Sequence, residues 1–91
     1  MTKILESLID ELECCSKLIE GDSPDYSAML LDYARKLRDV ENREETLNSF
    51  YRYATHYKGL ADEQPSNIST SRWTMIVERL RAASINAVNA S

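Results

Sequence analysis

The chain has 91 residues and a mass of 10.4 kDa, a length that accommodates one domain. Its 43% hydrophobic and 29% charged residues are typical of a folded globular protein, and with two glycines and two prolines a fold of many β-hairpins is disfavoured. The formal net charge of −4 is uneven, at −6 over residues 1–45 and +2 over residues 46–91. An acidic half disfavours nucleic-acid binding, which depends on Lys and Arg at phosphates, and favours a basic protein partner.

The sequence contains no sign of a membrane span or a secretory signal. No apolar run approaches the ~20 residues that cross a bilayer. The first residues, MTKILESLIDELE, contain acids where a signal peptide requires an apolar stretch. We therefore expect a cytoplasmic protein that makes no membrane contact.

Two amphipathic helices are predicted in the first half of the chain. Thr2 is a candidate N-cap for a helix over residues 3–20. Apolar residues recur there at intervals of three and four, and the predicted core stripe consists of Ile4, Leu5, Leu8, Ile9, Leu12, Cys15, Leu18 and Ile19. The same spacing covers residues 24–40, where the predicted core stripe consists of Tyr26, Met29, Leu30, Tyr33, Ala34, Leu37 and Val40. There, Ser23 is the candidate N-cap and Pro24 occupies the first helical position, where a missing N–H is tolerated.

The second half predicts two more helices, separated by one sizeable loop. The third helix covers residues 43–58, and Asn42 with Glu45 resembles a capping box at its start. Residues 59–69 are rich in small polar residues and form the loop. The fourth helix covers residues 71–88. The apolar stripe expected on the third helix consists of Leu47, Phe50, Tyr51, Ala54 and Tyr57.

Together these patterns predict an all-α fold, a compact bundle of four amphipathic helices that makes one helical domain of residues 1–91. No helix can bury its stripe alone, so the four must pack together. A core of this size gives only modest stability, which leaves a homodimer open as an alternative to a monomer.

One candidate binding surface is the outer face of the first predicted helix. Glu6, Asp10, Glu13 and Glu20 recur at intervals of three, four and seven, which places them on its solvent side. An exposed helical face does not give two carboxylates the different environments that acid–base catalysis needs. The face is therefore either merely solvated or a docking surface for a basic partner.

A second candidate surface lies at the end of the third predicted helix. Tyr53 and His56 are three residues apart, off the apolar stripe, and are expected to be exposed together. Exposed tyrosine is a common interface anchor. The loop after Gly59 adds Asp62 and Glu63 to this candidate set. Alternatively, Tyr53 packs its ring on the loop and leaves only its hydroxyl in water.

The residues that usually carry chemistry are few. Cys14 and Cys15 are adjacent, a spacing that suits neither a metal chelate nor an unstrained disulfide, and His56 is the only histidine. Cys15 lies on the apolar stripe and is expected in the core. No GxSxG, HExxH or phosphate-binding glycine loop is present. We therefore expect no enzyme activity, no metal and no cofactor; an enzyme would require an exposed cysteine beside His56.

The fourth predicted helix is the most basic element, through Arg72, Arg79 and Arg81. In an acidic domain these arginines are expected to form internal salt bridges or a dimer seam rather than to contact nucleic acid.

The segments LESLIDEL, DYSAMLLDYARKL and LNSFYRYATHYKGLAD, in this order within residues 5–63, resemble a family of small helical bacterial proteins. Members of that family are encoded beside polymorphic toxins, including those of contact-dependent inhibition systems, and serve as their immunity proteins. The resemblance implies an immunity protein or antitoxin that binds and neutralises a cognate toxin domain. Nuclease toxins bind phosphates and so present basic clefts, which an acidic protein can cover.

Two alternatives remain at this point. One is a phage-type inhibitor that mimics the charge of DNA to block a host nuclease, which would need acids spaced like phosphates along an extended face. The other is a regulatory or structural helical adaptor that acts as a dimer. An adaptor would be favoured by exposure of Trp73 and Ile76 on the fourth helix.

Overall fold

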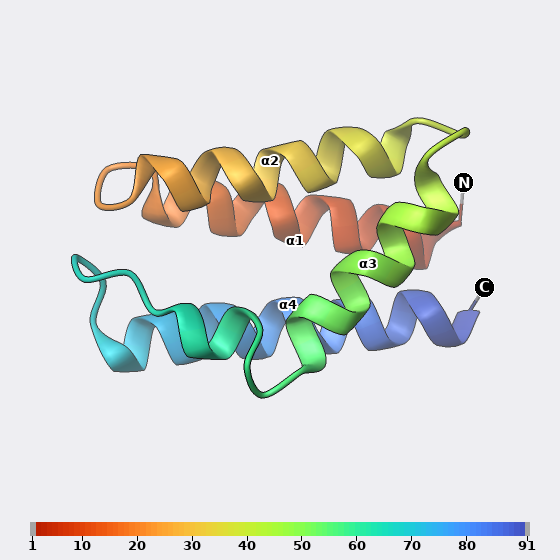
Figure 1. Cartoon of the computed structure of the whole chain (residues 1–91). Helices are drawn as coiled ribbons and strands as arrows, with labels where there is room; N and C mark the ends of the chain where they lie inside the picture. The colour runs from red at the N-terminus through yellow and green to blue at the C-terminus, as the bar shows by residue number, and fades with distance from the viewer. Residues whose placement is uncertain (1, 91) are drawn as a thin grey trace.

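The computed structural model of the chain describes residues 2–90 and confirms the all-α prediction. Within these residues there are four α-helices, no strand and one short 3-10 helix (Figure 1). The elements are α1 (Lys3–Ile19), α2 (Pro24–Arg38), α3 (Arg43–Thr55), η1 (Leu60–Glu63) and α4 (Thr70–Ala90). In the described residues, none of the helices has both the length and the apolar character of a membrane span.

The four helices surround one core. α1 packs against α2 and α4, and α3 also packs against α2 and α4. Figure 1 shows α1 and α2 as an antiparallel pair, with α3 running obliquely from the end of α2 across to α4. The 3-10 helix η1 packs against α3 and α4.

The starts of the first two helices follow local sequence rules. The backbone N–H of Leu5 donates to the Thr2 hydroxyl oxygen at 3.2 Å, as expected of an N-cap. Pro24 occupies the first turn of α2 as predicted. Ser23 stands at the N-cap position but makes no side-chain capping hydrogen bond.

The third helix begins at Arg43 as predicted, but its N-terminal capping and its C-terminal end differ from the prediction. Asn42 is the N-cap residue, but its side-chain amide donates to Asp39 Oδ2 at 2.7 Å, and the capping box with Glu45 does not form. The helix ends at Thr55, three residues earlier than expected, because the backbone becomes extended at His56. This early end lets the following residues turn back toward the core.

The predicted loop over residues 59–69 packs against the core and contains the short helix η1. It begins with η1, and its apolar residues Leu60, Pro65 and Ile68 are buried. The indole N–H of Trp73 in α4 donates to the Leu60 carbonyl oxygen at 3.1 Å. The connection is therefore held in place by α4, and η1 has a defined position.

Helical spacing misassigned several apolar residues to the core. Val40 and Tyr57 are 76% and 73% exposed, because α2 and α3 end before reaching them. Ile4 and Leu18 are also exposed, at the edge of α1. By contrast, α4 continues to Ala90, two residues beyond its predicted end.

The arginines of α4 connect it to its neighbours. Arg72 pairs with Asp22 at 2.7 Å, and Arg79 pairs with Glu11 of α1 at 2.8 Å, so the expected internal salt bridges are confirmed for these two residues. Arg81 instead donates to the Ala54 carbonyl oxygen at 3.4 Å.

Candidate functional site

Three of the four acids predicted on the outer face of α1 have free carboxylates. Glu6, Asp10 and Glu20 are exposed, and their side chains form no ion pair or hydrogen bond within residues 2–90. Glu13 differs, because its Oε1 accepts a hydrogen bond from Arg38 Nη2 of α2 at 3.0 Å. Glu13 therefore joins α1 to α2, and the remaining acids, here called the α1 acidic face, consist of Glu6, Asp10 and Glu20.

The second predicted surface, at the end of α3 and in the following loop, does not form one cluster in the structure. Tyr53 is half-buried rather than exposed, and its hydroxyl donates to Glu63 Oε2. His56 is exposed, and its ring stacks on that of Tyr57 at a centroid distance of 4.8 Å. Asp62 is exposed. Tyr53 and Glu63 are therefore brought together, whereas the exposed His56 ring stacks on Tyr57 and shares with Tyr53 only another shallow depression at the end of α3.

Tyr53 and Glu63 belong to a shallow groove between α2, α3 and η1, which we call the tyrosine groove. It is lined by Asp25, Tyr26, Met29 and Tyr33 of α2, Tyr53 of α3 and Glu63 of η1. The lining includes three tyrosines, a thioether and two carboxylates, and no Lys or Arg. The groove is thus both aromatic and acidic.

The rings of the tyrosine groove are fixed from behind by the core. Tyr26 packs edge-on against Trp73 at 5.6 Å, and Tyr33 packs edge-on against Phe50 at 4.8 Å. Tyr33 and Tyr53 are nearly parallel, with an interplanar angle of 22° and centroids 6.3 Å apart. Because the tyrosine rings already pack against buried residues, their side chains lose little conformational freedom when a ligand binds.

Two of the groove's tyrosine hydroxyls have a raised pKa. Burial raises the pKa of the Tyr53 hydroxyl, and its hydrogen bond to Glu63 raises the pKa further. Burial, followed by the nearby charge of Glu63, also raises the pKa of Tyr26. Beside the groove, hydrogen bonds from Arg35 and Lys36 lower the pKa of Asp32, so its carboxylate stays ionised and is paired with these two cations. Within the groove lining, Asp25 and Glu63 are the residues with a formal charge, and no Lys or Arg of the lining is paired with them.

Sequence reasoning named Tyr53 and Glu63 but missed the α2 side of the groove. Tyr26, Met29 and Tyr33 follow the helical spacing of the apolar stripe, which predicts core positions for all three. In the structure they lie at the edge of the core, half-buried. Their residue type was the available signal, since a tyrosine on an apolar stripe needs water or a partner for its hydroxyl.

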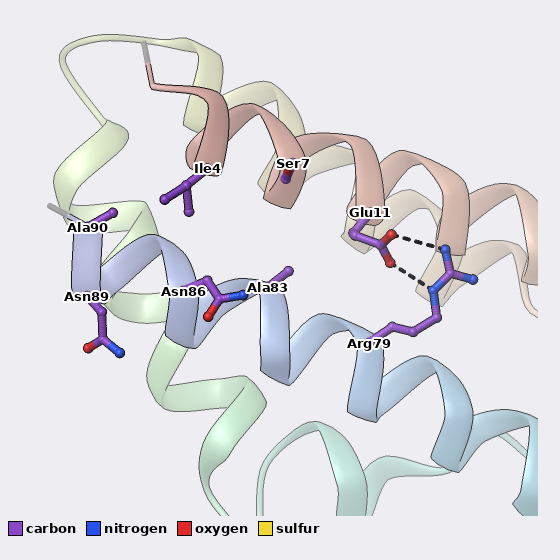
Figure 2. Close-up of a pocket in the computed structure, with 8 residues that line it drawn as sticks. All are labelled: Ile4, Ser7, Glu11, Arg79, Ala83, Asn86, Asn89 and Ala90. Atoms are coloured by element: carbon purple, nitrogen blue, oxygen red, sulfur yellow. Dashed lines mark hydrogen bonds and ion pairs between the residues drawn. The ribbon is translucent and has the colours of Figure 1, made fainter.

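A second groove runs between α1 and the C-terminal part of α4 (Figure 2). Its charged residues, Glu11 and Arg79, neutralise each other through hydrogen bonds of 2.8 and 3.2 Å. The bond to Glu11 raises the pKa of Arg79. The rest of the lining is small, apolar or amide-bearing: Ile4, Ser7, Ala83, Asn86, Asn89 and Ala90. This groove offers a ligand no free charge, so it is a weaker candidate than the tyrosine groove.

The two cysteines differ in access, which gives a testable result. Cys15 is fully buried, and burial raises the pKa of its thiol to about 11, whereas Cys14 is exposed with its Sγ 3.5 Å from Arg79 Nη2. We expect iodoacetamide to modify Cys14 in the native protein and to modify Cys15 only after denaturation. Mass spectrometry of the intact chain and its peptides measures both events. Equal native labelling of the two thiols would contradict the burial of Cys15.

Among residues 2–90, no group of three or more His, Cys, Asp or Glu side chains is placed to hold a metal ion. No family model matches the chain, and no curated protein or solved structure matches it either.

Proposed function

We propose that this chain is a protein-binding protein of the immunity or antitoxin type, which neutralises a basic partner, in the first instance a nuclease toxin domain. The α1 acidic face carries this proposal: Glu6, Asp10 and Glu20 are exposed and have no internal counter-ion within residues 2–90. They belong to the half of the chain whose net charge is −6. The resemblance of residues 5–63 to immunity proteins supports the same function.

The proposed mechanism is occlusion. A nuclease domain holds phosphates with Lys and Arg, and those side chains attract a surface of unpaired carboxylates. Attraction between the two surfaces speeds encounter, and salt weakens it because charges are screened over roughly 10 Å at an ionic strength of 0.1 M. Once bound, the acidic protein blocks access of nucleic acid to the cleft. The proposal requires no cofactor, membrane or nucleic-acid contact by this chain.

The two alternatives have less support. The adaptor dimer depended on exposure of Trp73 and Ile76, and both are buried. The DNA mimic depended on an extended acidic face, and Glu13 has its charge compensated by Arg38.

Charge reversal on the α1 acidic face tests the proposed function. The triple variant Glu6→Lys, Asp10→Lys and Glu20→Lys should associate with the partner about tenfold more slowly at low salt, since the steering charge is inverted. The partner is obtained by pull-down on the tagged protein at low and moderate salt and identified by mass spectrometry. Biolayer interferometry then gives the association rate, and the partner's own activity is assayed with and without the chain.

The matched control is the triple variant Glu41→Lys, Glu44→Lys and Glu78→Lys. Glu44 lies in the first turn of its helix, as Glu6 does, and Glu41 lies in an interhelical connection beside the α2 end, as Glu20 lies at the α1 end. Glu78 corresponds to Asp10 as an exposed mid-helix acid. Both variants change the net charge equally. If both triple variants slow association with the partner equally, the effect comes from net charge alone. If the chain leaves the partner's activity unchanged, the proposed neutralisation is contradicted.

A further inference from the structure

We propose that the tyrosine groove binds an arginine side chain of a basic protein partner. This inference rests on the proposed function for the nature of the partner, and it adds a specific receptor site. No residue of α1 lines the groove, so it and the α1 acidic face can be tested separately.

The first argument is charge. Asp25 and Glu63 are exposed carboxylates in the lining, and the lining contains no Lys or Arg to neutralise them. The nearby cations Arg35 and Lys36 share the single carboxylate of Asp32, which leaves one positive charge beside the groove, but both side chains are exposed to solvent and neither lines the groove. A cation entering the groove therefore meets two unneutralised carboxylates and displaces no internal ion pair.

The second argument is the aromatic lining. Tyr26, Tyr33 and Tyr53 are half-buried and surround the same space, with Met29 against the Tyr53 hydroxyl at 3.7 Å. Aromatic faces attract cations, and the attraction increases when the site is partly desolvated. Neutral or anionic ligands would gain from the rings but not from the carboxylates. The combination therefore selects a cation.

The third argument concerns which cation fits. Glu63 Oε2 accepts the Tyr53 hydrogen bond, which orients the carboxylate and leaves Oε1 without a hydrogen bond from the described residues. A planar guanidinium can stack on a tyrosine ring while its N–H groups donate to carboxylate oxygens. A lysine ammonium is compact and strongly hydrated, so it cannot stack on the ring as a planar group while it donates to the carboxylate. Arginine is thus the favoured occupant.

Three capped pentapeptides provide the probe: Gly-Gly-Arg-Gly-Gly and its lysine and citrulline analogues. Citrulline has nearly the shape of arginine without the charge. Each peptide is titrated into the isotope-labelled full-length chain, and NMR shifts are followed. We expect the arginine peptide to shift the ring resonances of Tyr26, Tyr33 and Tyr53, with an affinity about tenfold above that of the citrulline peptide. The lysine peptide should be intermediate.

Two neighbouring acids of η1 provide matched variants. Glu63→Gln removes the charge but retains an amide oxygen that can accept the hydrogen bond from Tyr53. It should lower the affinity for the arginine peptide about tenfold. Asp62→Asn changes the net charge equally but lies outside the groove, and it should change affinity by less than about twofold. Asp25→Asn is a second groove variant that does not touch the Tyr53 contact. Thermal melts establish that each variant is folded.

Three outcomes would overturn the inference: equal binding of the arginine and citrulline peptides, equal weakening by Glu63→Gln and Asp62→Asn, or shifts confined to residues outside the groove. The partner assay separates this inference from the proposed function. If the α1 variant slows partner association and Glu63→Gln leaves the complex unchanged, the groove inference is wrong and the proposed function stands. If the peptide results are as expected and no partner is neutralised, the groove stands and the immunity function is wrong.

Discussion

Replacing Gly59 with alanine is expected to destabilise the folded chain by about 2–3 kcal/mol, because the added methyl group overlaps backbone atoms. A Cβ at this buried position would overlap the Tyr53 carbonyl oxygen and lie 3.0 Å from the Tyr53 carbonyl carbon and 3.2 Å from the His56 carbonyl oxygen. Backbone atoms cannot rotate away as a side chain can. Relief therefore requires movement of the end of α3 or of η1.

Gly21→Ala is the control for Gly59→Ala. A Cβ at Gly21 would meet nothing within 4 Å, and its φ is not positive. Alanine there should leave stability unchanged or raise it by up to about 1 kcal/mol, by restricting the unfolded chain. Urea denaturation measures both variants. Equal stabilities would show that the turn after α3 adapts to a side chain and does not fix η1 in place.

The clash at Gly59 also has a consequence for the tyrosine groove. Gly59 immediately precedes η1, which carries Glu63, and Tyr53 belongs to the last turns of α3. A shift between these elements would separate the Tyr53 hydroxyl from Glu63. We therefore expect Gly59→Ala to impair binding of the arginine peptide even at temperatures where the variant remains folded.

The helices could be predicted from sequence because their signals are local. Thr2 caps α1 through a residue three positions away, and Pro24 sets the start of α2 by its own geometry. The end of α3 at Thr55 could not be predicted in this way. The backbone becomes extended at His56 and leads into a segment whose Leu60 and Ile68 are buried, which is a tertiary feature and not a local one.

The candidate site was predicted only in part, for the same reason. The free carboxylates of Glu6 and Asp10 follow from helical periodicity, which places them opposite the apolar stripe. The pairing of Glu13 with Arg38 joins residues 25 positions apart and depends on how α1 packs against α2. The tyrosine groove likewise requires α2, α3 and η1 to meet, and no spacing within one helix shows that Tyr26 and Glu63 line the same cavity.

Trp73→Ala is expected to destabilise the chain by about 3–5 kcal/mol, because it removes the largest fully buried side chain. At roughly 0.05–0.15 kcal/mol per residue, such a loss takes a large part of the stability of a small domain. The indole also connects three parts of the fold. It lies in α4, its ring meets that of Tyr26 in α2, and its N–H donates to the Leu60 carbonyl oxygen of η1.

Trp73→Phe separates the hydrogen bond from the packing. Phenylalanine keeps an aromatic ring in the core, but the Leu60 carbonyl oxygen loses its indole donor, which should cost about 1–3 kcal/mol. Amide hydrogen exchange should then accelerate in η1 more than in α1, and the arginine peptide should bind more weakly although Asp25 and Glu63 are unchanged. Unaltered exchange in η1 would contradict this, and would mean that Leu60 and Ile68 hold the segment through burial alone. Accelerated exchange with unaltered peptide binding would instead show that the groove tolerates a mobile Glu63.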